Sequence, residues 1–78
     1  MSREIPIEGE TIRLGQLLKL AGIAESGSAA KLLLESEPVL VNGSPETRRG
    51  RQLHPGDSIR VGEEELRLLA GPGEQAAP

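Results

Sequence analysis

The sequence predicts one α+β domain in which two helices pack on a small antiparallel sheet of about four or five short strands. Three observations support this fold class. Apolar residues between Leu14 and Ala21 recur at the spacing of one helical face. A second helical stretch starts near Ser26 and ends before Pro38, which cannot continue a helix. Short runs that alternate polar and apolar residues flank these stretches, and a length of 78 residues suits one domain.

The first predicted element is a short strand over residues 4–8, where polar and apolar side chains alternate. Pro6 has no backbone N–H to donate, so we expect this strand at an edge of the sheet. Gly9 then ends the strand.

The first helix is predicted from about Ile12 to Ala21. Its apolar face consists of Leu14, Leu17, Leu18 and Ala21. Either Thr11 or Arg13 can stand at its start, and the sequence does not decide between them. Gly22 is the expected end, because glycine readily adopts the left-handed conformation that terminates helices.

The second helix is predicted to follow a short connection and to run to about Ser36. Either Ser26 or Ser28 can cap its first turn by accepting a backbone N–H. Ala30, Leu33 and Leu34 would face the first helix, giving a compact helix pair. The helix start also offers N–H groups that suit an anion. The alternative is that the serines only cap the helix.

The stretch from Pro38 to Gly56 contains two predicted turns. A strand over residues 39–41 leads into Asn42-Gly43, a pair that tolerates positive φ and therefore favours a tight hairpin. Pro55-Gly56 suits the two central positions of a type II turn.

Two further strands are predicted over residues 58–61 and 66–69, joined by a turn near Gly62. Residues 70–78 offer little apolar surface to bury, so we expect a disordered tail there and a folded domain over residues 1–69.

Composition excludes several classes of function. The chain has no cysteine and no aromatic residue, and His54 is its one histidine. We therefore expect no metal site, no cofactor, no catalytic residue and no small-molecule substrate. No apolar run approaches the roughly 20 residues of a membrane span, and the N-terminus lacks a signal-peptide pattern. The prediction is a cytoplasmic, non-enzymatic protein without membrane contact.

Charge is distributed unevenly along this acidic chain, whose net charge is −3. Residues 11–54 carry six basic and four acidic side chains, whereas both flanking segments are acidic. Arg48, Arg49 and Arg51 lie within four positions of one another. They can form a local cationic surface, because salt screens distant charges beyond about 8–10 Å. The alternative is a solvated arginine-rich connection without a binding role.

These segments together resemble the RNA-binding domain named after small-subunit ribosomal protein S-four, also called the αL motif, and most closely its small stand-alone bacterial members. The resemblance is carried by residues 12–23, Ser26-Gly27-Ser28-Ala29-Ala30-Lys31, Val39-Leu40-Val41-Asn42-Gly43 and residues 46–57, which begin Glu-Thr-Arg-Arg-Gly. It extends over roughly residues 4–69. One departure is Glu37-Pro38, which stands where the family usually has glycine and implies a different helix exit.

The resemblance implies a helix pair on a strongly bent antiparallel sheet, with structured RNA bound by the helix pair and the adjoining loop. Carried over by position, the RNA-binding residues would be Arg13, Gln16, Ser26, Ser28, Lys31, Asn42, Ser44, Arg48, Arg49 and Arg51. Such side chains suit phosphate and 2′-hydroxyl contacts, which need no aromatic stacking.

The leading functional hypothesis is therefore non-catalytic binding of structured RNA, with ribosomal RNA or a ribosome-associated particle in translation as the target. The alternative is a protein-interaction module with the same fold, for which Leu20 and Leu32 offer apolar contacts outside the predicted core. A ubiquitin-like sulfur carrier is a third reading, discounted because such carriers end in Gly-Gly and this sequence ends in Ala-Ala-Pro. A monomer is expected.

Overall fold

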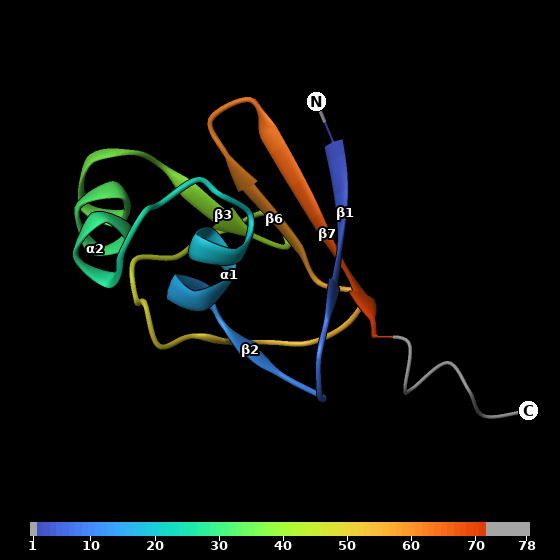
Figure 1. Ribbon diagram of the computed structural model, residues 1–78. Coiled ribbons are helices and arrows are strands. Elements are labelled where there is room, and N and C mark those ends of the chain that lie inside the picture. Colours follow the sequence, from blue (N-terminus) through green and yellow to red (C-terminus); the bar gives the residue numbers. More distant parts are fainter. Residues whose placement is uncertain (1, 72–78) are drawn as a thin grey trace, which may run out of the picture.

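The computed structural model describes residues 2–71. Its elements are β1 (Ser2–Ile7), β2 (Ile12–Arg13), α1 (Leu14–Leu20), α2 (Gly27–Ser36), β3 (Val39–Val41), β4 (Ser44–Pro45), β5 (Gln52–Leu53), β6 (Ser58–Val61) and β7 (Glu64–Ala70). The α+β fold class is confirmed, and both helices lie on the same side of the sheet (Figure 1). Within the described residues, neither helix is long and apolar enough to cross a membrane.

The main sheet has five strands in the order β1-β7-β6-β3-β4. The expected wholly antiparallel arrangement is wrong at one position, because β1 pairs with β7 in parallel from Ser2 opposite Glu65 to Ile7 opposite Ala70. A tight turn forces its two strands to be antiparallel, but the helix pair separates β1 from β7 and removes that constraint. The expected edge position of the strand that contains Pro6 is confirmed.

A second, two-stranded sheet was not expected and moves the start of α1. Ile12 and Arg13 form β2, which pairs antiparallel with β5, so the helix begins at Leu14 with Arg13 as its N-cap rather than Thr11. The first helical N–H groups donate to the loop before β5: Leu14 to the Arg51 carbonyl at 2.9 Å, and Gly15 to the Arg49 carbonyl at 3.0 Å. The loop thus caps the helix.

The turns follow the sequence prediction closely. Asn42 and Gly43 have φ of +52° and +85°, the left-handed pair that a two-residue hairpin requires. Gly56 has φ of +96°, and the Asp57 N–H donates to the His54 carbonyl at 3.0 Å, as the predicted turn demands. Gly22 ends α1 with φ of +77°.

The ends of α2 and β7 refine two other expectations. Glu37, which follows the last residue of α2, has an extended conformation rather than a left-handed one. This agrees with the expected effect of Pro38, since a proline favours an extended conformation in the residue before it. The predicted tail was placed too early, because Ala70 belongs to β7 and Gly71 is buried. The rest of the predicted tail, residues 72–78, lies outside the described residues.

The core lies between the helices and one face of the main sheet. It is aliphatic and consists of Ile7, Leu14, Leu17, Leu18, Ala24, Ala30, Leu34, Val39, Val41, Leu53, Ile59, Val61, Leu66 and Leu68. Full burial of a large aliphatic side chain contributes roughly 1.5–3 kcal/mol, and burial of this set compensates for the lack of aromatic residues. The large apolar side chains left exposed among residues 2–71 are Leu20 and Leu32.

Candidate functional site

A buried carboxylate organises the arginine-rich loop between β4 and β5. Glu46 is 7% exposed and accepts five hydrogen bonds. Three come from Arg48, through its backbone N–H, Nε and Nη2, at 3.0 to 3.2 Å. The others come from the Thr47 N–H at 3.0 Å and from Arg51 Nη1 at 2.8 Å. Glu46 thereby fixes the path of the loop.

These contacts set the charge state of the loop. Side-chain and backbone hydrogen bonds from Arg48, followed by that from Arg51, hold the pKa of Glu46 well below its usual range. The same carboxylate raises the pKa of Arg48. Two of the three loop arginines, Arg48 and Arg51, therefore form ion pairs with Glu46, which the sequence analysis did not predict.

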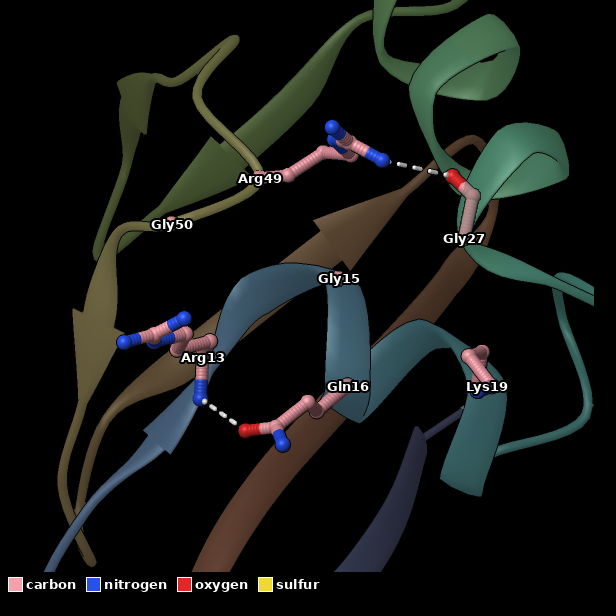
Figure 2. A pocket seen from close by; sticks show the side chains of 7 residues that line it. All are labelled: Arg13, Gly15, Gln16, Lys19, Gly27, Arg49 and Gly50. Carbon is pink, nitrogen blue, oxygen red and sulfur yellow. Dashed lines mark hydrogen bonds between the residues drawn. The ribbon is translucent and has the colours of Figure 1, made fainter.

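The third loop arginine joins three elements. The Arg49 carbonyl accepts the Gly15 N–H at the start of α1, at 3.0 Å. Its Nη1 donates to the Gly27 carbonyl at the start of α2, at 3.2 Å (Figure 2). A Cβ at position 15 would lie 3.4 Å from the Arg49 Cβ, at van der Waals contact, so the start of α1 and the loop pack closely here. Arg49 therefore lies where both helices and the loop meet.

An open pocket of about 570 Å³ lies at this junction. It is lined by Arg13, Gly15, Gln16, Lys19, Gly27, Arg49 and Gly50 (Figure 2). Three of these residues are cations, and none of the three takes part in an ion pair within the part of the chain that the structure describes. Three others are glycines, which leave the backbone accessible. We call this site the cationic pocket.

Helix periodicity explains how α1 contributes to the cationic pocket. Arg13, Gln16 and Lys19 are spaced three residues apart and lie on one side of α1, from its N-cap to its last turn. Gln16 Oε1 accepts the Arg13 N–H at 3.1 Å, which helps to cap the helix. The structure thus brings Arg13, Gln16 and Arg49 together. Lys19 was not among the predicted site residues, although its spacing from Gln16 was a usable signal.

The predicted residues of α2 lie beside the cationic pocket rather than in its lining. Ser26, not Ser28, is the N-cap, and its Oγ accepts the Ala29 N–H at 3.1 Å. Ser28 and Lys31 are exposed on the first turns of the helix. The Ser26 hydroxyl keeps a proton that can be donated to a ligand.

The predicted residues of the β3–β4 hairpin have a different environment. The Asn42 side chain donates to Asp57 Oδ1 at 3.1 Å and accepts the Ser58 N–H at 2.9 Å, so it joins two turns. Burial tends to raise the pKa of Asp57, but hydrogen bonds from the His54 N–H and from Asn42 outweigh it, and the pKa is lowered. Ser44 is exposed on β4. Neither Asn42 nor Ser44 lines the cationic pocket.

The chemistry of the cationic pocket suits an anion. Its guanidinium and ammonium groups are positively charged hydrogen-bond donors, and the negatively charged oxygens of a phosphate are strong acceptors for such groups. Among residues 2–71, no group of three His, Asp or Glu side chains is placed to hold a metal ion. The fold and this pocket define a small α+β domain with a cationic pocket at the junction of its helices and loop.

Comparison with known proteins identifies the family. The sequence model of the S4 domain matches residues 5–69, and the chain therefore belongs to the S4 domain family. This confirms the resemblance found in the sequence. A relative from Bacillus subtilis (strain 168), named "Probable ribosome maturation protein RlbA", is 48% identical over 61 residues. The aligned region is 78% of this chain and 86% of that relative.

Proposed function

We propose that this protein is a non-catalytic binder of structured RNA, with ribosomal RNA or a maturing ribosomal particle as its target. The observation that carries the proposal is the convergence of Arg13, Lys19 and Arg49 on one open pocket, with no carboxylate paired to any of them in residues 2–71. Membership of the S4 domain family supports RNA as the ligand, and the name of the Bacillus relative supports a role in ribosome maturation.

The pocket chemistry favours RNA backbone over isolated bases. Folded RNA is recognised largely through its shape, phosphates and 2′-hydroxyls, and the last of these can pair with the Gln16 amide. The chain has no aromatic side chain on which a base can stack. Gly15, Gly27 and Gly50 leave room for a phosphate to approach the protein backbone closely.

The predicted residues then take distinct parts. Arg13, Gln16 and Arg49 contact the RNA together with Lys19, and Ser26, Ser28 and Lys31 extend this surface along α2. Arg48 and Arg51 shape the loop through Glu46 and add charge at its edge. Asn42 holds the hairpin in place, and Ser44 lies at the margin of the surface.

The test compares two charge-matched double variants. One is Arg13→Gln with Lys19→Gln in the cationic pocket. The other is Arg60→Gln with Arg67→Gln, which removes the same charge from exposed positions on β6 and β7. Binding to ribosomal RNA fragments and to a single-stranded control would be measured at one salt concentration. We expect tighter binding to structured RNA and a loss of affinity of roughly tenfold in the pocket variant alone. Equal loss in both variants, or no RNA binding at low salt, would contradict the proposal.

Replacing all three loop arginines is a poorer test. Removing Arg48 and Arg51 would leave the Glu46 carboxylate buried without its ion-pair partners, and a charge left so is strongly destabilising. Weaker RNA binding by that variant would therefore report damage to the loop as well as lost contacts.

A further inference from the structure

A second groove lies on the other side of α1. It has a volume of about 570 Å³ and is lined by Pro6, Glu8, Thr11, Ile12, Gln16 and Leu20. Its lining residues come from the end of β1, the loop that follows, the start of β2 and α1; Figure 1 shows where these elements lie in the fold. Gln16 lines both this groove and the cationic pocket, so the two sites adjoin.

Three of the residues that line this groove, Pro6, Ile12 and Leu20, have apolar side chains. Leu20 is 58% exposed, because the inward stripe of α1 consists of Leu14, Leu17 and Leu18 while Leu20 lies one turn after Gln16. A single exposed leucine is ordinary. Here, however, Leu20 shares a concave surface with Pro6 and the half-buried Ile12. Leu32, the other exposed leucine of the described chain, lines neither this groove nor the cationic pocket.

The rim of the groove is acidic. Glu8 lines it, and Glu10 precedes Thr11 in the same exposed loop. Neither glutamate forms an ion pair within residues 2–71. These charges repel an RNA backbone and attract a cationic segment, the reverse of the charge preference of the cationic pocket. The groove is therefore complementary to a partner that is both basic and apolar.

We propose that this groove binds a short basic peptide segment with an apolar anchor side chain, supplied by a protein associated with the same RNA. The peptide's apolar side chain packs on Leu20, Ile12 and Pro6, and its cations approach Glu8 and Glu10. The association of that protein with RNA rests on the proposed function, whereas the peptide chemistry rests on the groove alone. Because the two sites adjoin, one ribonucleoprotein surface can occupy both.

The test uses a defined peptide and a matched pair of variants. The probe is a short flexible peptide with one leucine flanked by lysines, and a second peptide has serine in place of that leucine. The groove variant combines Leu20→Gln with Glu8→Gln. The control variant combines Leu32→Gln with Glu35→Gln, an equivalent change on the exposed face of α2. Binding to the complete chain is followed by calorimetry and by backbone amide chemical shifts.

We expect the leucine peptide to bind the wild type and the control variant alike and the groove variant about tenfold more weakly. The serine peptide should bind all three weakly. Equal binding of the leucine peptide to all three proteins would overturn the proposal, as would shifts that cluster away from residues 6–20. Concentration-dependent self-association abolished only in the groove variant would identify a second copy as the occupant and would also overturn it.

The RNA measurements separate this inference from the proposed function. The groove variant keeps Arg13, Lys19 and Arg49, so it should bind structured RNA like the wild type. Loss of peptide binding with intact RNA binding supports two separate sites. RNA that crosslinks to position 20 would show that RNA occupies the groove and would refute the peptide proposal.

Discussion

Arg49 offers the sharpest test of the proposed RNA site, because it contributes both charge and geometry. Its guanidinium is one of the three cations in the cationic pocket that form no ion pair within residues 2–71, and it also donates to the Gly27 carbonyl at 3.2 Å. Arg49→Lys keeps the charge but removes the rigid planar fork. Arg49→Gln removes both. The two variants therefore separate the electrostatic contribution from the positional one.

The expected magnitudes follow from counterion release. Each phosphate neutralised on duplex RNA is taken to contribute about −0.9 to the slope of log affinity against log salt, by analogy with B-DNA. Three cations then give a slope of about −2.7, or about a 40-fold loss of affinity between about 50 and 200 mM salt. Arg49→Gln should reduce the slope to about −1.8 and the loss to about 12-fold, whereas Arg49→Lys should keep the wild-type slope at a lower affinity.

The assay is a fluorescence-anisotropy titration of a labelled ribosomal RNA fragment at several salt concentrations, with Arg60→Gln as the control for overall charge. Circular dichroism would establish that each variant is folded. A wild-type slope in Arg49→Gln would refute phosphate neutralisation by Arg49. A slope reduced equally in Arg49→Lys and Arg49→Gln would show that the fork geometry, not the charge, controls binding.

Three predictions concern stability. The pKa of Glu46 is lower in the folded state than its ordinary value of 4.5, so ionised Glu46 stabilises the fold above pH 4.5 and this stabilisation is lost as the pH falls towards the folded-state pKa. Urea unfolding between about pH 5 and 2 should show this loss of stability. Glu46→Gln should make the free energy of unfolding less dependent on pH in that range. Leu17→Ala should reduce the free energy of unfolding by about 2–5 kcal/mol, because Leu17 is fully buried. Leu32→Ala, at an exposed position, should change it by less than about 0.5 kcal/mol. An equal loss in both variants would contradict the core assignment. Gly71→Ala should lower the melting temperature by several degrees, about 4–8 °C per kcal/mol, because a Cβ there would collide with the Ile7 carbonyl; an unchanged melting temperature would show that the strand end readjusts freely.

Local interactions explain why much of the fold could be predicted from the sequence. Each helix can be predicted from the spacing of its apolar residues. Gly22 marks the end of α1 and Ser26 marks the start of α2, and the geometry of both caps is set by a few neighbouring residues. The hairpin at Asn42-Gly43 is equally local, since both residues must adopt positive φ. The family resemblance added the order of these elements and was confirmed over residues 5–69.

The candidate site could be predicted only in part. The family resemblance implied Arg13 and Gln16, and the basic run contains Arg49; the structure places all three in the lining of the cationic pocket. Lys19 could not be assigned to the site from the sequence, because the helical pattern does not show which side of α1 the arginine-rich loop approaches. The three loop arginines lie close together in the sequence and therefore look equivalent. In the structure they differ, because the Glu46 carboxylate pairs with Arg48 and Arg51 but not with Arg49.

The helices and the tight turns thus follow from the sequence alone, because each depends on contacts within a few residues. The aliphatic character of the core also follows, because the chain has no aromatic residue. Tertiary structure alone decided the parallel pairing of β1 with β7, the late start of α1 and the ion cluster of Glu46 with Arg48 and Arg51. The first two features join segments that lie far apart in the chain, and the third depends on the burial of Glu46, which no local pattern shows. Charge on a side chain is read from sequence, but whether that charge is free for a ligand depends on which groups the folded chain places against it.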